Sequence, residues 1–355
     1  MKTVVTVSGI RPDFIRMSEV FRGLDNCEWC NHILVHTGQH YDRLLSDIFF
    51  EDLEIRTPDY NLLIGGPGKK HYQQQADIGV KLIELFKEQQ ISPDVVLFLG
   101  DSNSVLASVP LRKEGYKIGH IEAGMRSYDE RMLEEINRKV CDHVSDFLFV
   151  YHENYKAKAL KEGISRDKIF VVGNTIIEPL KKTANLNYLG SKSHIILDIH
   201  RPENFNYNER MKKIIKFANL CAKKTNKPVK MLNFKRTLGS LIDNNIALGE
   251  IELVDLMGYK NFVKFMQDSL FIISDSGTAQ EEPALLNIPV IVPREYTERP
   301  ESVENGNSLM MDVLDDERFF DYIDWALTDR SPSAAWLGDG QTSNKIIKTL
   351  EELLK

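Results

Sequence analysis

Cysteine is scarce in this chain of 355 residues, which contains only Cys27, Cys30, Cys141 and Cys221. Cys27 and Cys30 form a C-x-x-C, but no second cysteine pair and no histidines at ligand spacing accompany them. We therefore expect neither a disulfide scaffold nor a zinc site, and we predict that the thiols are reduced.

Long apolar runs and a surplus of positive charge are also missing. No run approaches the roughly 20 residues of a membrane-spanning helix, and residues 3–7 are too few for the apolar region of a signal peptide. The net charge of −7 argues against a general nucleic-acid-binding surface, although a local basic pocket could still hold a phosphorylated small molecule. We expect a cytoplasmic protein that binds neither membrane nor nucleic acid.

Short apolar runs rich in β-branched residues alternate with longer amphipathic segments. Such runs are typical of strands buried on both faces of a parallel sheet, with helices as crossovers, and they predict an α/β fold. The runs are residues 3–7, 33–35, 95–99, 116–121, 147–150, 169–172, 195–199, 229–232, 270–273 and 288–292.

The length predicts two domains. Residues 181–193 are polar and divide the strands into two similar sets, so we interpret them as a linker between two doubly wound, Rossmann-like domains, 1–180 and 191–335. An amphipathic helix within 336–355 is expected to pack back on the domains. Parallel sheets bind ligands beyond the carboxyl ends of their strands, so functional residues should follow the strands and line a cleft between the domains.

Residues 119–139 suggest proton chemistry because they bring carboxylates towards such a cleft. Glu122 ends an apolar run, while Glu134 and Glu135 fall in the first turn of a helix predicted from apolar residues at Ile136, Val140 and Val144. For Glu134 and Glu135, stabilisation of the helix dipole is the alternative role.

Other N-terminal candidates also follow predicted strands. Arg11 lies in a turn suited to a phosphate, and Asp101 follows residues 95–99 as a helix cap or a site residue. Gln39 and His40 belong to a polar segment that we interpret as a substrate-lining loop. A metal site at His36 and His40 is not expected, because Gly38 separates them in a loop. Residues 65–75 predict a mobile loop that either closes over a ligand or is a solvated connection.

The second half contains candidates for binding a nucleotide. His200 and Arg201 combine an imidazole with a phosphate-pairing charge at a strand end. Residues 276–278, Ser-Gly-Thr, precede a helix and predict an anion site, with Glu282 a turn further on to accept the ribose hydroxyls. Arg299 could neutralise a diphosphate, and a solvated charge run is the alternative.

These motifs occur together in a fixed order over nearly the whole chain: SGIRPD, HTGQHYD, GDSNS, HIEAGMRS, EEINR, GNT, HRPEN, SDSGTAQEE, TERPE and GDGQTS. In combination they resemble the non-hydrolysing UDP-N-acetylglucosamine 2-epimerase family, which has the two-domain glycosyltransferase-B fold. The resemblance implies C2 epimerisation between UDP-GlcNAc and UDP-ManNAc through elimination and re-addition of UDP, without a cofactor or a metal.

The resemblance also assigns roles, residue by residue. It implies that Asp101, Glu122, Glu134 and His200 are catalytic. It implies that the nucleotide is bound by Arg11, Ser276, Gly277, Thr278, Glu282 and Arg299. We also predict that Gln39, His40, Arg138 and Arg201 bind the substrate. A homodimer and a place in polysaccharide biosynthesis are further expectations.

The chain departs from the family pattern at three places. Asp13 replaces a glutamate, Phe234 stands where a histidine is more common, and residues 65–75 lack an Arg-Gln pattern associated with allosteric substrate binding. The pattern DERMLEEINRK is also similar to relatives that act on altered UDP-sugars. Three alternatives stay open: the same reaction on a 6-deoxy-L-hexosamine or 3-acetamido uronic acid, a glycosyltransferase of the same fold, and a silent nucleotide-sugar-binding protein.

Overall fold

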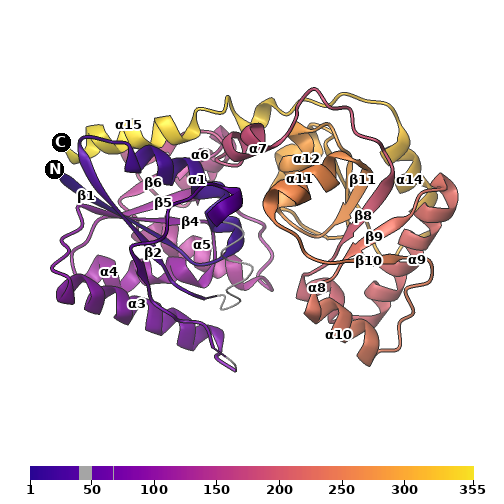
Figure 1. The fold of residues 1–355 in the computed structure, drawn as a ribbon, viewed down its shortest axis with the longest axis horizontal. Coiled ribbons are helices and arrows are strands. Elements are labelled where there is room, and N and C mark those ends of the chain that lie inside the picture. The colour runs from indigo at the N-terminus through magenta and orange to yellow at the C-terminus, as the bar shows by residue number, and fades with distance from the viewer. Residues whose placement is uncertain (40–49, 67) are drawn as a thin grey trace. The chain divides into compact units, whose positions relative to one another are not determined.

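The computed structural model describes residues 1–39, 50–66 and 68–355, and the chain divides into two compact units (Figure 1). The N-terminal unit comprises Met1–Pro179 and Leu337–Lys355, and the C-terminal unit comprises Leu180–Trp336. Each unit is built on a parallel sheet with helical crossovers, which confirms the predicted α/β class.

The sheet of the N-terminal unit contains, among the described residues, seven parallel strands in the order β3-β2-β1-β4-β5-β6-β7. Because the strand order reverses between β1 and β4, a ligand is expected beyond the carboxyl ends of these two strands. The strands are β1 (Lys2–Ser8), β2 (Cys30–His36), β3 (Tyr60–Asn61), β4 (Val95–Leu99), β5 (Ile118–Ala123), β6 (Phe147–Val150) and β7 (Ile169–Val171).

The helices of this unit include one from the end of the chain. α15 packs against α1, where Gly23 allows a close approach: a Cβ there would lie 2.2 Å from Cδ1 of Ile347. Within the described part of the chain the helices include α1 (Arg11–Asp25), α3 (His71–Glu88), the 3₁₀ helix η1 (Asn103–Ala107), α4 (Ser108–Lys113), α5 (Leu133–Val144), α6 (Glu153–Lys161), α7 (Ile177–Thr183, which extends across the unit boundary) and α15 (Thr342–Leu354).

The C-terminal unit repeats this plan with a six-stranded parallel sheet in the order β10-β9-β8-β11-β12-β13. Its strand order reverses between β8 and β11. The strands are β8 (His194–Asp198), β9 (Val229–Leu232), β10 (Glu252–Val254), β11 (Ser269–Ser274), β12 (Val290–Val292) and β13 (Ser308–Met310). The helices are α8 (Pro202–Phe205), α9 (Asn208–Thr225), α10 (Lys235–Asp243), α11 (Tyr259–Gln267), η3 (Thr278–Gln280), α12 (Glu282–Leu285), α13 (Pro300–Glu304) and α14 (Phe319–Leu327).

The segment predicted to be a linker is attached to the C-terminal unit. The hydroxyl of Tyr188 and the backbone N–H of Ser191 both donate to the carboxylate of Asp268, and Gln267 donates to the carbonyl of Asn185 at 2.8 Å. Residues 181–183 belong to α7 instead, so the irregular part of the segment begins at residue 184.

Two sequence predictions need correction. Residues 65–75 are not all loop, because α3 begins at His71, where the side chain of Gln73 accepts the backbone N–H of Lys70 at 3.0 Å and caps the helix. In α5, the apolar residues that predicted the helix do not form its buried face: Ile136 is 48% exposed, whereas Asn137 and Arg138 are buried.

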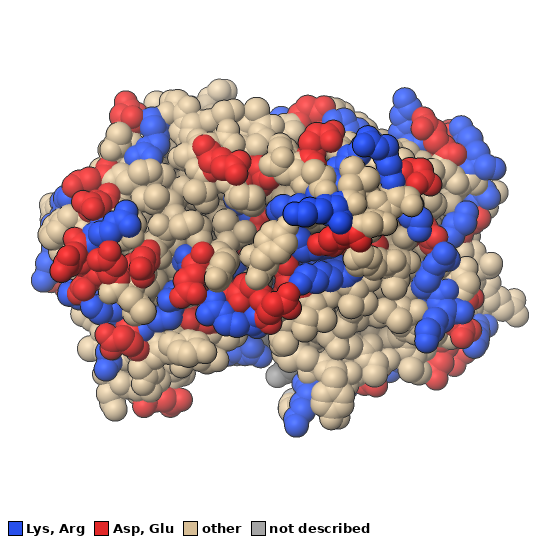
Figure 2. All heavy atoms as spheres, turned by 180° about the vertical axis from the view of Figure 1, so that it is seen from behind, with Lys and Arg blue, Asp and Glu red and all other residues tan. Residues whose placement is uncertain are grey.

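The surface carries both signs of charge. On the face drawn in Figure 2, acidic and basic side chains are intermingled rather than separated into two regions. Across residues 1–39, 50–66 and 68–355, no helix combines the length and apolar character that crossing a membrane requires. All four cysteines are free thiols.

Candidate active site

Asp101 lies just beyond the carboxyl end of β4 and is held there by α5. Its carboxylate pairs with the buried guanidinium of Arg138, and its backbone carbonyl accepts a hydrogen bond from Asn137 Nδ2 at 2.8 Å. The polar face of α5 is therefore buried because it positions Asp101. Arg138, predicted to bind substrate, also pairs with Glu135 at 2.8 Å.

Glu122 interrupts the end of β5, the strand next to β4. Its φ is +67°, and the pairing register with β6 shifts between Ile121 and Ala123, as in a β-bulge. A left-handed conformation is costly for a glutamate and is characteristic of functional sites. The buried carboxylate lies 2.8 Å from Nη1 of Arg16, which is also buried, so α1 supplies a compensating charge.

A buried polar network fixes the ends of β4 and β5 relative to each other. The ring of His120 joins the carboxylate of Asp142 and the carbonyl of Gly100, each at 2.7 Å. Asp142 also accepts the backbone N–H of Gly124 at 3.1 Å and pairs with Arg126. Because Gly100 precedes Asp101 and Gly124 follows Glu122 closely, this network constrains the backbone beside both predicted catalytic carboxylates.

Asp13 adds a third carboxylate to this strand-end cluster. Burial raises its pKa to about 7, the negative charges of Asp101 and Glu122 contribute in the same direction, and hydrogen bonds from the N–H groups of Gly9 and Ile10 oppose the shift. The structure thus brings Asp13, Asp101 and Glu122 together, and Asp13 was recognised in the sequence only as a departure from the family pattern.

Glu134 and Glu135 have different surroundings at the start of α5. Glu134 is half-buried. Glu135 is fully buried and accepts hydrogen bonds from the backbone N–H groups of Ser127 and Tyr128 and from the hydroxyl of Ser127. These contacts support the structural role considered for Glu135 and leave Glu134 as the candidate proton-transfer group.

Three further predicted residues belong to the N-terminal unit. Arg11 is the first residue of α1, and burial lowers the pKa of its guanidinium. Gln39 accepts a long hydrogen bond of 3.4 Å from the hydroxyl of Ser104. His40 lies outside the described residues, and its role remains a prediction.

The C-terminal unit places the predicted anion-binding segment directly after β11. Gly277 permits the guanidinium of Arg299 to lie against the chain, since a Cβ there would come within 2.4 Å of Arg299 Nη1. Arg299 Nε in turn donates to Glu281 at 2.8 Å. Ser276, Gly277 and Thr278 therefore lie beside a fixed positive charge, which suits a diphosphate.

Two more arginines surround the buried Glu298. Arg294 lies 2.9 Å from it and Arg201 lies 3.5 Å from it. Arg201 was predicted, whereas Arg294 was not singled out although it directly follows β12 and Pro293. Glu282, which follows Ser276, Gly277 and Thr278 in the chain, is buried and accepts a hydrogen bond from the hydroxyl of Tyr259 at 2.8 Å.

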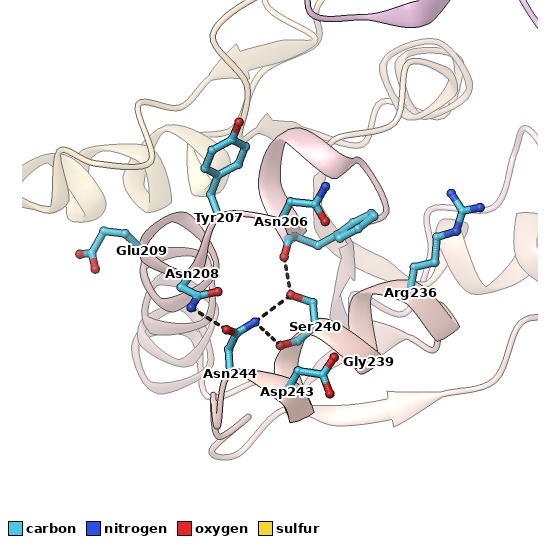
Figure 3. A pocket seen from close by; sticks show the side chains of 10 residues that line it. Asn206, Tyr207, Asn208, Glu209, Arg236, Gly239, Ser240, Asp243 and Asn244 are labelled. Carbon is cyan, nitrogen blue, oxygen red and sulfur yellow. Dashed lines mark hydrogen bonds between the residues drawn. The ribbon is translucent and has the colours of Figure 1, made fainter. Parts of the chain in front are cut away.

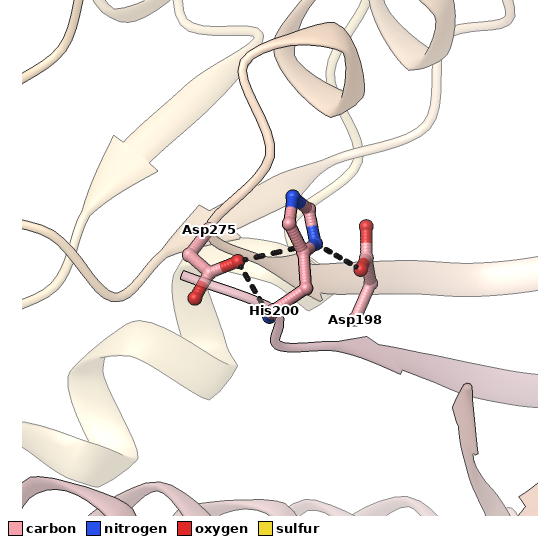
Figure 4. A group of neighbouring side chains, drawn as sticks. All are labelled: Asp198, His200 and Asp275. Atoms are coloured by element: carbon pink, nitrogen blue, oxygen red, sulfur yellow. Dashed lines mark hydrogen bonds and ion pairs between the residues drawn. The ribbon is translucent and has the colours of Figure 1, made fainter. Parts of the chain in front are cut away.

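His200 follows β8 and lies between two carboxylates (Figure 4). Its Nδ1 is 2.9 Å from Asp198 and 3.5 Å from Asp275. Burial opposes the charged form, but the two carboxylates outweigh it and raise the pKa of His200. The three side chains also have the spacing of metal ligands. We interpret the short distance between His200 Nδ1 and Asp198 Oδ1 as a hydrogen bond. A proton on Nδ1 is then enough to explain why these side chains lie close together.

A cavity of about 820 Å³ opens among α8, α9 and α10 (Figure 3). Its walls are tied by hydrogen bonds from Asn208 to Asn244 and from Ser240 to the carbonyl of Phe205. None of the predicted site residues that the structure describes lines it. We therefore do not identify this cavity with the nucleotide site.

The fold is that of a two-unit α/β protein, with a carboxylate cluster at strand ends of one unit and a group of arginines paired with buried glutamates in the other. The family model described as UDP-N-acetylglucosamine 2-epimerase matches residues 22–351. This chain belongs to that family, whose named members are isomerases, and its fold is of the glycosyltransferase-B type, as the resemblance implied.

Individual relatives support the assignment along the full length. The chain is 35% identical to a UDP-N-acetylglucosamine 2-epimerase of Methanococcus maripaludis, over 98% of this chain and 97% of the relative. It is 31% identical, over 99% of both chains, to a Pseudomonas aeruginosa UDP-2,3-diacetamido-2,3-dideoxy-D-glucuronate 2-epimerase. The crystal structure of Methanocaldococcus jannaschii UDP-GlcNAc 2-epimerase in complex with UDP-GlcNAc and UDP superposes with a TM-score of 0.90 at 31% identity, covering 99% of this chain and 100% of that chain.

Proposed function

We propose that this protein interconverts UDP-GlcNAc and UDP-ManNAc by inverting C2 of the sugar. The observation that carries the proposal is the grouping of Asp101 and Glu122 at the ends of adjacent strands, with Glu122 held in a left-handed conformation. Proton removal and return at one carbon require positioned acid–base groups, and carboxylates in a buried cluster are suited to that work.

The chemistry divides into an elimination and its reversal. A carboxylate removes the C2 proton as the C1–O bond breaks, a C1=C2 double bond forms, and the electron pair of the broken bond leaves with UDP. UDP then returns to C1 while a proton reaches the opposite face of C2, so two proton-transfer groups are needed. We assign Asp101, Glu122 and Glu134 to these roles.

The C-terminal unit is proposed to hold UDP throughout. Ser276, Gly277, Thr278 and Arg299 suit the diphosphate, with Arg201 contributing positive charge and Glu282 accepting the ribose hydroxyls. Arg11, Gln39, His40 and Arg138 remain proposed substrate-binding residues of the N-terminal unit.

Product analysis with a panel of nucleotide sugars tests this assignment. Purified protein incubated with UDP-GlcNAc should form UDP-ManNAc, with no acceptor and no added cofactor. The Pseudomonas aeruginosa relative makes a 3-acetamido uronic acid substrate the second candidate. If the protein converts that sugar or a 6-deoxy analogue but not UDP-GlcNAc, the converted sugar is the substrate. Sugar transfer to an acceptor without C2 inversion would indicate a glycosyltransferase.

We further propose a cytoplasmic homodimer whose product feeds polysaccharide synthesis. Exposed apolar side chains on α3, Tyr72 at 65% and Val80 at 54%, support a face covered by a second copy. Analytical ultracentrifugation tests the proposed dimer, and a monomer at micromolar concentration contradicts it.

A further inference from the structure

The imidazole of His200 is held by a carboxylate to which the proposed mechanism assigns no role. Asp198, the last residue of β8, accepts a hydrogen bond from His200 Nδ1 through Oδ1 at 2.9 Å (Figure 4). A carboxylate can only accept, so Nδ1 is the donor and the second ring nitrogen, Nε2, points away from both carboxylates.

Asp198 also connects His200 to the proposed diphosphate segment. Its Oδ2 accepts the hydroxyl proton of Ser274 at 2.8 Å, and Ser274 Oγ in turn accepts the backbone N–H of Ser276 at 3.0 Å. Both oxygens of this nearly buried carboxylate are therefore used, one for the histidine and one for the turn after β11.

A second carboxylate beside the imidazole, that of Asp275, also favours its charged form. Asp275 is fully buried, lies 3.5 Å from Nδ1 and accepts the backbone N–H groups of His200 and Arg201 at 3.1 Å each. The ring of Phe234, at the N-cap position of α10, packs against the imidazole with the ring centroids 5.0 Å apart. Arg201 is the facing cation that opposes the charge.

We propose that Asp198 is a positioning residue that keeps His200 protonated as an imidazolium and orients Nε2–H for the diphosphate of the nucleotide. The identity of the substrate rests on the proposed function, whereas the protonation state of His200 does not. During elimination the electron pair of the C1–O bond moves onto the departing phosphate oxygen. The imidazolium stabilises that charge through a hydrogen bond and keeps its proton, while the C2 proton goes to a carboxylate.

Titration of His200 by NMR tests this directly, without any requirement for turnover. In the full-length protein labelled with ¹⁵N-histidine, His200→Gln identifies the resonances of His200. We expect a wild-type pKa above the ordinary value of about 6.5 and a decrease of about one unit or more in Asp198→Asn, which keeps the shape but removes the charge. Asp316→Asn is the control, because Asp316 lies in the same unit and pairs with Lys213 and Lys216 instead.

Kinetics then distinguish positioning from a merely structural contribution. In Asp198→Asn the alkaline limb of the kcat profile should move to lower pH while the KM at low pH stays close to wild type, and Asp198→Glu should restore part of the shift. An unchanged His200 pKa in Asp198→Asn overturns the proposal. If Asp198→Asn does not fold, a His200 pKa at or below about 6.5 in the wild-type protein overturns it. Titration that appears only after EDTA treatment would also overturn it and indicate a metal. If no nucleotide sugar of the panel is epimerised, the proposed function is wrong, but the inference about the protonation of His200 is not affected.

Discussion

At the scale of single residues, Glu122 combines three features that rarely occur together. It has a positive φ, it lies at a shift in strand register, and its buried carboxylate is paired with Arg16. Holding such a conformation costs on the order of 1–3 kcal/mol, which the surrounding network must offset. We infer that the site requires this side chain to point in a direction that a regular strand would not give.

Replacement of Glu122 by glutamine should remove proton transfer and, because it leaves the buried Arg16 less compensated, lower the free energy of unfolding in a protein that still folds. We expect C2 exchange to fall by about 10²- to 10⁴-fold in Glu122→Gln, with UDP affinity unchanged, because glutamine keeps the shape but cannot take a proton. Hydrogen exchange at C2 and calorimetric UDP binding are the measurements. Glu54→Gln is the control, since Glu54 is an exposed glutamate with a positive φ of 54° in the same unit. Loss of UDP binding or of folding would show that Glu122 is structural.

Asp13 should make stability depend on pH. Its pKa is raised from 3.8 to about 7, so the native state binds this proton more tightly than the unfolded state, and the resulting stabilisation is lost as pH rises from about 4 to about 7. Asp13→Asn removes the buried charge. Its free energy of unfolding should exceed that of wild type at pH 8 by on the order of 1–3 kcal/mol, with a smaller difference at pH 5.

Urea denaturation at several pH values checks this prediction. Asp167→Asn, a change at an exposed position of the same unit, should show no such trend. A difference between Asp13→Asn and wild type that does not grow with pH would mean that Asp13 is ionised in the native state without cost.

At the scale of elements, α5 shows why a correct helix prediction can still misplace a face. Apolar spacing at Ile136, Val140 and Val144 predicted the helix, but the buried residues include Glu135, Asn137, Arg138, Cys141 and Asp142. Burial of this polar face is explained by its partners Asp101, Ser127 and His120, all of which lie outside the helix. Periodicity alone could not reveal them.

The adjacent glutamates of α5 form a matched pair. Glu135→Gln should lower the free energy of unfolding by about 2–4 kcal/mol, because it weakens three buried hydrogen bonds and one partly buried one and leaves Arg138 less compensated. Glu134→Gln should leave stability within about 0.5 kcal/mol but reduce epimerisation strongly. Thermal unfolding and epimerisation kinetics of both variants are the measurements. A loss of stability in Glu134→Gln together with a loss of activity alone in Glu135→Gln would assign the structural role to Glu134 and proton transfer to Glu135.

The strands show what the sequence could and could not predict. Runs such as β4 and β9 were predicted with their observed bounds because strands buried on both faces are continuously apolar. β3, β10 and β13 were missed. They are edge strands of two or three residues, and β10 is largely exposed, so neither length nor burial pattern distinguishes them from loops.

At the scale of the whole molecule, the two units carry different chemistry: the candidate carboxylates lie in the N-terminal unit and the candidate nucleotide-binding residues in the C-terminal unit. The positions that follow predicted strands indicated which residues were candidates for the site. The family resemblance then implied a role for most of them. The supporting partners Arg16, Asp198 and Arg294 were not predicted, because their contribution depends on contacts across long sequence separations. Arg16 Nη1, for example, meets a glutamate more than one hundred residues further along the chain.

This division predicts that nucleotide binding and proton transfer can be separated by mutation. Glu282→Ala in the C-terminal unit should weaken UDP binding by roughly tenfold or more, since a charged hydrogen-bond acceptor for the ribose is lost. Glu295→Ala, at a half-exposed carboxylate of the same unit, should not. Isothermal titration calorimetry with UDP is the measurement, and unchanged affinity in Glu282→Ala would remove that residue from the ribose site.

We propose that carboxylates of this protein exchange the C2 proton of a UDP-sugar with solvent. Incubation of the wild-type protein with UDP-GlcNAc in D₂O, followed by NMR, measures this exchange. We expect deuterium at C2 of the UDP-ManNAc formed and of the recovered UDP-GlcNAc, and at no other ring position. Formation of UDP-ManNAc that retains the original C2 hydrogen would contradict it.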